Sequence, residues 1–281
     1  MAKMANLRTH KRVPAALLGC LLVVAGTANA QDLLTGFPRM PDGRPNFTGV
    51  WQALGTAWLD IEPHAASEGH FYQLGAMGAV PAGLGVVVGG EIPYLPEARA
   101  KQQENFENRL ALDPVVRCYM PGVPRATYMP FPFQIVQGTE EILIAYEFAT
   151  ANRVIFIDGE ELSPVDSWMG WSNSAWDGDT LVVEVTGLNG ESWFDHAGNH
   201  MSNAARIVER YTPLGPNHIR YEATIEDPNT FSRPWTIRLP LYRRVEENAQ
   251  TLEFKCVEFT EQLLYEDVSR TPESASGVPN D

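Results

Sequence analysis

The residues best suited to chemistry lie in one polar cluster, in which Asp195, His196 and His200 stand close together and Glu209 follows. Glu209 is expected to share one face of a strand with Ile207, because successive side chains of a strand point to opposite sides. A carboxylate among apolar neighbours loses hydration, which raises its pKa and suits it to proton transfer near neutral pH. We therefore predict that Glu209, with His196, His200 and Asp195, forms a catalytic group that moves a proton and needs no cofactor.

Glu209 also has a purely structural interpretation. An arginine such as Arg153 or Arg233 would pair with a buried carboxylate and hold it ionised, so that it takes no part in a reaction. The alternation of residues around Glu209 is compatible with both interpretations, and the choice stays open at this point.

A metal site in the same cluster is not predicted. His196 and His200 are spaced so that they share a face only in a helix, where residues i and i+4 are neighbours. Gly198 and Asn199 lie between them and indicate a turn. Asp195 would be the third ligand of such a site.

Aromatic and basic side chains supply the candidate ligand-binding residues. The seven Trp suit the walls of a cavity for an aromatic or isoprenoid molecule, although Trp in a barrel also serves as ordinary core. Arginines in an acidic chain would bind a carboxylate or phenolate, with hydrogen bonds to loop carbonyls as the alternative. The predicted ligand-binding residues are Trp51, Trp168, Trp171, Trp193, Tyr128, Tyr146, Arg117 and Arg125.

The elements that must position these residues are strands. From about residue 133 onward, apolar side chains recur at every second position, and turn residues such as Asp177-Gly178 separate the runs. Eight or nine sequential strands predict an all-β fold, an up-and-down meander closed into a lipocalin-like barrel, with a sandwich as the alternative. A barrel of that size holds one small ligand. The expected strands include residues 47–54, 142–148, 153–158, 181–185, 205–211, 219–225, 235–241 and 252–259.

The chain divides into four segments. Residues 31–132 are expected to form an N-terminal arm, the first strand, a long Gly-rich loop and one polar surface helix over 95–110. The apolar, Gly-rich run 75–90 is either a lid over a ligand cavity or a packed flap. Residues 133–268 are expected to form the main barrel, and residues 269–281 a flexible tail.

Residues 1–30 have the pattern of a cleavable secretory signal. Four basic residues precede an apolar run, and Ala28-Asn29-Ala30 supplies a small-residue cleavage site before Gln31. The apolar run is too short for a transmembrane segment. We predict a periplasmic or secreted protein, with a lipoprotein modified at Cys20 as the alternative.

Composition limits the partners and the redox state. Loss of residues 1–30 would change the formal net charge from −14 to −18, which disfavours nucleic acid and anionic membrane surfaces as partners. Two cysteines would remain, Cys118 and Cys256, and a disulfide between them is expected in an oxidising compartment. Two separate buried thiols are the alternative.

Several motifs carry a family resemblance. Gly49-Val50-Trp51 is similar to the Gly-x-Trp signature of lipocalins. The chain from about Pro41 to Tyr265 resembles a large family of secreted bacterial proteins of unknown function. That family pattern commonly has His directly before the residue that is Ser202 here, whereas this chain has Met201 there and His at 200. The motifs are residues 41–51, 168–170, 176–183, 208–211, 225–228 and 233–235.

Two classes of function are compatible with these residues. The first is a cofactor-independent lyase, isomerase or hydratase that acts on an aromatic or isoprenoid substrate. The second is a non-catalytic, lipocalin-like periplasmic protein that binds a small apolar or aromatic molecule. The chain has no Gly-x-Ser-x-Gly elbow, P-loop or dinucleotide fingerprint, which argues against serine hydrolases, kinases and dehydrogenases.

Overall fold

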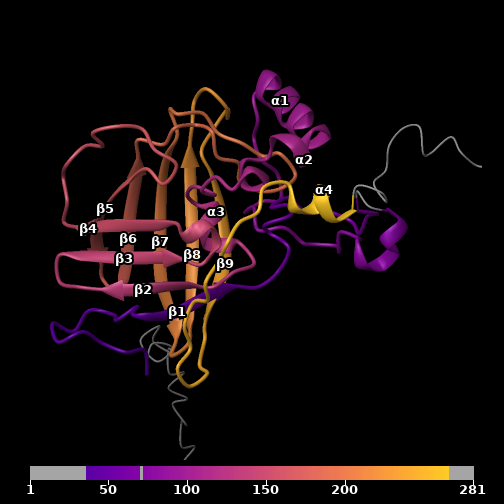
Figure 1. Ribbon diagram of the computed structural model, residues 1–281. Helices are drawn as coiled ribbons and strands as arrows, with labels where there is room; N and C mark the ends of the chain where they lie inside the picture. Colours follow the sequence, from indigo (N-terminus) through magenta and orange to yellow (C-terminus); the bar gives the residue numbers. More distant parts are fainter. Residues whose placement is uncertain (1–35, 70–71, 266–281) are drawn as a thin grey trace, which may run out of the picture.

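A computed structural model describes residues 36–69 and 72–265 (Figure 1). Its nine strands form a closed barrel in sequence order, because β1 pairs with both β2 and β9. The predicted signal 1–30, the cleavage site before Gln31 and the tail 269–281 lie outside the described residues. The strands are β1 (Gly49–Ala53), β2 (Phe133–Gln137), β3 (Glu141–Tyr146), β4 (Asn152–Ile157), β5 (Trp171–Asp177), β6 (Thr180–Thr186), β7 (Arg206–Gly215), β8 (His218–Glu226) and β9 (Trp235–Arg243).

The predicted all-β barrel is therefore confirmed, with one departure from a simple meander. β4 and β5 pair in parallel, whereas every other pair of neighbouring strands is antiparallel. Residues 158–170 make this possible, because parallel neighbours need a crossover connection of about a dozen residues or more. Figure 1 shows β2–β4 running across the direction of β6–β9, so the barrel is flattened into two crossing layers.

Apolar side chains at alternate positions fill the barrel. Ile144, Ile155, Val183, Ile207 and Ile219 are all fully or almost fully buried in one core cluster. A cavity of about 10 Å³ lies among inward-facing side chains such as Ile144, Ile155 and Tyr211, and such a volume holds about one water molecule. This cavity is far smaller than a site for a small-molecule ligand, which measures several hundred Å³.

The barrel closes around Trp51. Its indole Nε1 donates to the carbonyl of Phe47 at 2.8 Å, and the guanidinium carbon of Arg243 lies 4.2 Å from the ring centroid. Arg243 also donates to the Thr48 carbonyl. A Cβ at Gly49 would meet Arg243 Nη1 at 2.3 Å, and the φ of Gly49 is +148°. The Gly-x-Trp motif is therefore explained by the contact of β1 with Arg243 at the end of β9.

Helices lie outside the strands of the barrel. The predicted helix over 95–110 is α1 (Pro96–Glu107), followed by α2 (Arg109–Leu112). α3 (Arg125–Tyr128) has all four side chains buried. Within the described ranges, none of the helices is both long and apolar enough to span a membrane. The others are α4 (Thr260–Tyr265) and the short 3₁₀ helices η2 (Tyr72–Met77), η3 (Pro114–Arg117) and η4 (Phe148–Thr150).

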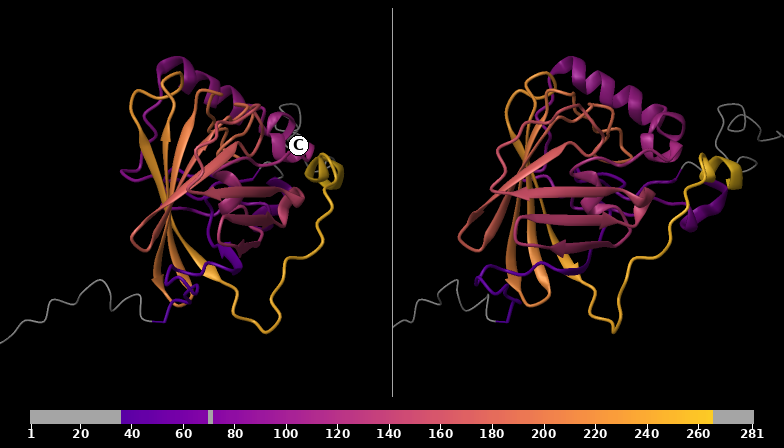
Figure 2. Two further views of the ribbon diagram at one scale, coloured as in Figure 1. Left: turned by 90° about the vertical axis from the view of Figure 1, so that its left-hand side faces the viewer. Right: turned by 60° about the vertical axis from the view of Figure 1, so that its left-hand side comes forward.

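The prediction of a last strand over residues 252–259 is wrong. Residues 251–257 have no strand pairing, and Figure 2 shows this segment running outside the barrel before it reaches α4. β1 already pairs with β9, so the closed sheet offers no free edge to another strand. We call residues 251–259 the strap.

Candidate functional site

A pocket of about 490 Å³ lies under the strap. This strap pocket is bounded by α2, η3 and α3 on one side and by the strap and the start of α4 on the other. Its volume is in the range of small-molecule sites, which are concave and mostly apolar with few polar groups. Its apolar walls include Trp58, Leu110, Met129, Phe131, Phe148 and Phe254.

His196 supplies a polar group in the pocket wall. Its Nδ1 lies 3.0 Å from Oδ2 of Asp113, and its side chain is 18% exposed. A neutral imidazole bonded through Nδ1–H to a carboxylate has an unprotonated Nε2. Nε2 has no hydrogen-bond partner among the described residues. His196 is therefore arranged to accept a proton from a molecule in the pocket.

Asp113 is held ionised behind His196. Burial alone would raise the pKa of Asp113, but the charge of Arg125 and hydrogen bonds from Arg125 and His196 outweigh it and lower the pKa to about 2. Arg125 binds both carboxylate oxygens, at 2.7 and 2.8 Å, and both side chains are almost completely buried. A bidentate pair of this kind fixes geometry as well as charge, so the acceptor for His196 Nδ1 is rigid.

The backbone that presents His196 is a tight loop, residues 193–200, which we call the histidine loop. Trp193 and His200 form an antiparallel bridge, and the Phe194 N–H donates to the Asn199 carbonyl at 2.6 Å. Asp195 stabilises the turn from inside, because its carboxylate accepts from the backbone and side-chain amides of Asn199. The predicted cluster is thus a turn, as Gly198-Asn199 indicated.

Helix α1 holds the outside of this loop. Gln102 Nε2 donates to the Ala197 carbonyl at 2.6 Å, and Asn105 Nδ2 donates to the Gly198 carbonyl at 3.2 Å. A Cβ on Gly198 would lie 2.7 Å from the Phe106 backbone nitrogen, so only glycine permits this approach. The helix predicted as a polar surface element therefore uses buried amides to fix the histidine loop.

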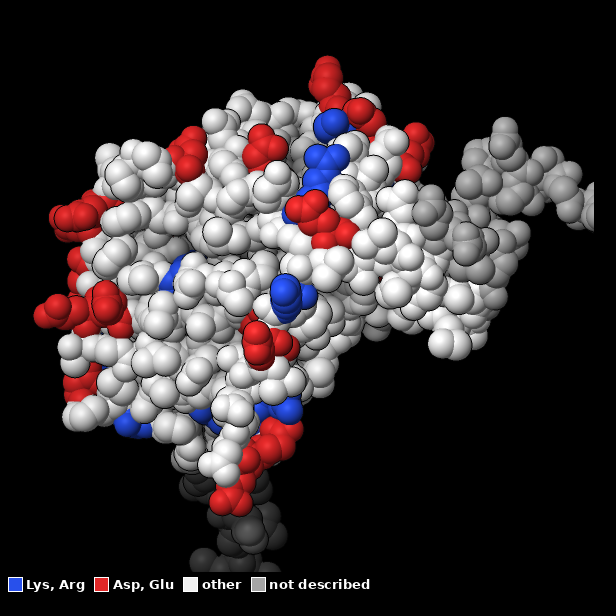
Figure 3. Space-filling view, viewed as in Figure 1, with Lys and Arg blue, Asp and Glu red and all other residues white. Residues whose placement is uncertain are grey.

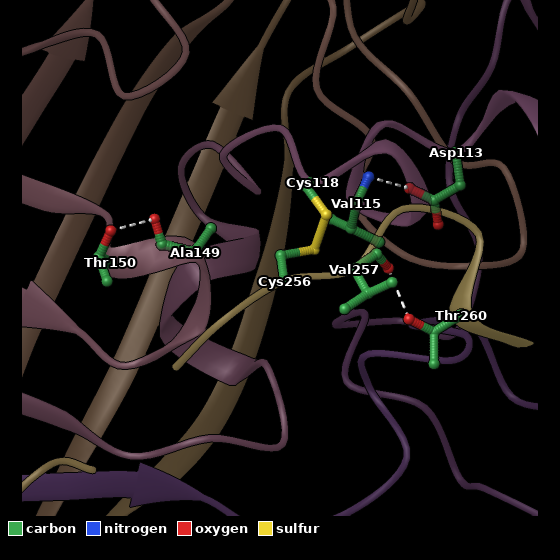
Figure 4. Close-up of a disulfide and its surroundings, with 8 residues drawn as sticks. All are labelled: Asp113, Val115, Cys118, Ala149, Thr150, Cys256, Val257 and Thr260. Carbon is green, nitrogen blue, oxygen red and sulfur yellow. Dashed lines mark hydrogen bonds between the residues drawn. A yellow bond between two sulfur atoms is a disulfide. The ribbon is translucent and has the colours of Figure 1, made fainter. Parts of the chain in front are cut away.

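The strap is joined to the rest of the site by the disulfide between Cys118 and Cys256, as predicted (Figure 4). Cys118 directly follows the last residue of η3. A second contact joins the strap to η3, because the Phe259 N–H donates to the Val116 carbonyl at 2.8 Å. Phe254 packs against Phe131 and Phe148, with ring centroids 5.2 and 5.0 Å apart. One covalent bond and a few contacts thus close the strap pocket.

Glu209 lies in a different place from His196. It forms a fully buried ion pair with Arg153, which also donates to Ser172 Oγ at 2.8 Å. Tyr221 donates to the same carboxylate at 2.6 Å, and Tyr211 does so at 3.2 Å. Among the described residues, no histidine is a partner of Glu209. The observed ion pair with Arg153 therefore agrees with the structural interpretation of Glu209.

His200 is separate from the strap pocket as well. Its ring stacks on Tyr94, with centroids 5.7 Å apart, and its backbone N–H donates to the Tyr94 hydroxyl. Burial lowers the pKa of His200. His200 therefore lies on the side of the histidine loop that faces Tyr94.

The predicted ligand-binding residues are distributed over several places. Arg125 lines the strap pocket, and Tyr128 donates to the Phe194 carbonyl at 2.8 Å. Arg117 donates to the Ala111 carbonyl. Tyr146 is buried in the barrel near Arg153.

Of the predicted Trp residues, Trp51 is buried in the closure of the barrel, and Trp193 lies in the histidine loop. Trp168 and Trp171 line a second pocket of about 410 Å³ beside the parallel pair β4–β5. Trp168 stacks on Tyr119 with ring centroids 5.1 Å apart. The aromatic residues therefore do not converge on one cavity.

Asp113 and the three Phe rings are site residues that the sequence patterns do not predict. Asp113 precedes Pro114, which indicates only the end of a helical segment, and its distance of 83 residues from His196 gives no signal in the sequence. Phe254 falls within the incorrectly predicted strand. Local sequence patterns therefore predict neither the contact of Asp113 with His196 nor the packing of Phe254 on Phe131 and Phe148.

The chain matches no protein-family model, and none of the curated proteins matches it. The family resemblance stays a prediction.

Asp195 provides a test of the histidine loop. Burial, followed by the charge of Asp60, raises its pKa to about 7 despite the donors from Asn199 and Ile61. The native state then holds a proton that the unfolded chain releases above about pH 4, so stability falls as pH rises from about 4 to 7. The total effect is on the order of 4 kcal/mol.

The measurement is urea unfolding at pH 5 and pH 8 for the wild type and for Asp195→Asn, which cannot ionise. The wild type should lose stability over this interval, and the variant should lose less. Asp113 does not interfere, because its lowered pKa changes stability only below about pH 4. Equal losses in both proteins would show that Asp195 is already ionised at pH 5.

Proposed function

We propose that this protein binds a small apolar molecule in the strap pocket and that His196 transfers a proton to or from it. The observation that carries the proposal is the bond between His196 Nδ1 and ionised Asp113, which leaves Nε2 as an acceptor in an apolar wall. An imidazole oriented by a carboxylate is the usual arrangement of a general base.

The proposed reaction is an isomerisation, elimination or hydration that uses side chains alone. In the isomerisation, Nε2 takes a proton from a carbon next to a carbonyl, and the imidazolium ion is stabilised by the Asp113 carboxylate. The same nitrogen returns the proton to another carbon, so atoms and charges balance. Asp113 and Arg125 are positioning residues in this scheme.

The proposed place of action is an oxidising compartment outside the cytoplasm. The Cys118–Cys256 disulfide supports this, because such bonds persist in the periplasm and in secreted proteins. The signal-like residues 1–30 agree with it.

Proton transfer can be tested without knowing the natural substrate. The protein is incubated in D₂O with apolar ketones that carry a ring, such as phenylacetone, and exchange of hydrogen beside the carbonyl is followed by NMR. Wild type should accelerate the exchange, and His196→Asn should lower the acceleration about a hundred- to ten-thousand-fold. The asparagine amide still donates to Asp113, which limits structural damage.

His218→Gln is the matched control, since His218 is an exposed residue of β8 that packs on Tyr242. It should exchange as the wild type does. Saturable ketone binding without accelerated exchange would instead make the protein a non-catalytic binding protein, and absence of binding would remove the strap pocket as the site.

A further inference from the structure

Lys255 lines the strap pocket and has no partner within the described part of the chain. Across residues 36–69 and 72–265 it forms no ion pair, hydrogen bond or ring contact. Its neighbours are both held in place, Phe254 by the rings of Phe131 and Phe148 and Cys256 by the disulfide. The backbone of Lys255 is therefore fixed beside the pocket, where the residue lines the wall.

The other ionisable side chains that line the pocket are Arg125, His196 and Glu261. Arg125 and His196 are paired with Asp113. Glu261 forms no ion pair among the described residues, and its charge raises the pKa of Arg109, which burial lowers. Glu253 and Glu258 are exposed residues of the strap that do not line the pocket.

Lys255 is thus the one cation that lines the pocket without an ion pair among the described residues, in a chain whose formal net charge is −14. Acidic side chains lie mostly around the edge of the face shown in Figure 3, with isolated basic groups between them. The long-range field of these acids is screened within about 8 Å at physiological salt. Local charges such as that of Lys255 therefore decide which ligand ends are attracted to the strap pocket.

The apolar walls of the strap pocket indicate what the uncharged part of the ligand looks like. Phe131, Phe148 and Phe254 contact one another with ring centroids 5.0–5.5 Å apart, and faces and edges of this kind suit a ring.

We propose that the strap pocket takes an amphipathic carboxylate, with a ring-bearing apolar body against the three Phe rings and its anionic end at Lys255. This inference rests on the proposed function, because it names the substrate class of the same pocket.

The test compares matched pairs of probes that differ only in their charged end. Phenylbutyrate and phenylbutanol, and the corresponding cyclohexyl compounds, are titrated into the whole protein by calorimetry at low and physiological salt. Wild type should bind each carboxylate about three- to tenfold more tightly than its alcohol, a preference that salt weakens. Lys255→Ala should abolish the preference, and Lys255→Glu should reverse it.

Lys101→Ala is the control, because Lys101 is an exposed residue of α1 that pairs with Glu104. It should keep the preference. Equal binding of acid and alcohol by the wild type, or a preference that survives Lys255→Ala, would overturn the carboxylate assignment and leave the proposed function standing. Binding of none of the probes would overturn both.

Discussion

Replacing Glu209 by glutamine is expected to destabilise the barrel by about 3–5 kcal/mol, because Arg153 would remain as an unmatched charge in the interior. Both side chains are at most 1% exposed. The introduced amide would still accept a hydrogen bond from Tyr221, so the loss reports the missing charge more than a missing hydrogen bond. The measurement is the free energy of unfolding in urea.

The matched control is the double variant Glu209→Gln with Arg153→Met, which removes both charges. It should recover much of the loss, since replacing a whole buried pair is often neutral or stabilising. A loss below about 1 kcal/mol in the single variant would mean that the interior is wetter than the structure shows.

Removing the disulfide with Cys118→Ser and Cys256→Ser is expected to lower the free energy of unfolding by up to about 5 kcal/mol. The bond joins residues 138 apart, and the chain-entropy model gives a value of about this size for so long a loop. Few other contacts hold the strap, so it should also separate from η3 in the native state.

Hydrogen exchange distinguishes the two effects. The amide of Phe259, which donates to Val116, should lose protection in the double variant, while amides of β7 and β8 should keep protection relative to the new global stability. Unchanged protection at Phe259 would show that the strap is held without the covalent link, and the pocket would then survive reduction.

The barrel could be predicted from the sequence because its cause is local. Alternation places Ile142, Ile144 and Tyr146 of β3 on the buried face, and most turns between antiparallel neighbours are short. The parallel β4–β5 pair was not predictable in this way, because alternation is the same whichever direction a strand runs. The wrongly predicted strand at 252–259 has a similar cause. Its residues are typical of a strand, but local composition does not show that β1 and β9 already pair with each other and leave no free edge.

The candidate site was only half predictable. His196 and Asp195 stand out as polar residues in a turn, and they do share the histidine loop. Their roles depend on Asp113 and Arg125, which reach the site through the fold. Glu209 shows the converse, since a carboxylate at an inward position predicts burial but not which cation lies beside it.

The contact of Arg243 with the Thr48 carbonyl joins residues 195 apart, so the ring of strands cannot close until β9 has been synthesised. A chain emerging N-terminus first, whether from the ribosome or across a membrane, holds β1 without either of its partners until much of the sequence has followed. Closure of the ring is thus a late and slow event governed by long loops. Before it, β1 presents open hydrogen-bonding edges that favour aggregation. Slow refolding is the expected consequence of a ring that closes between segments so far apart in the sequence.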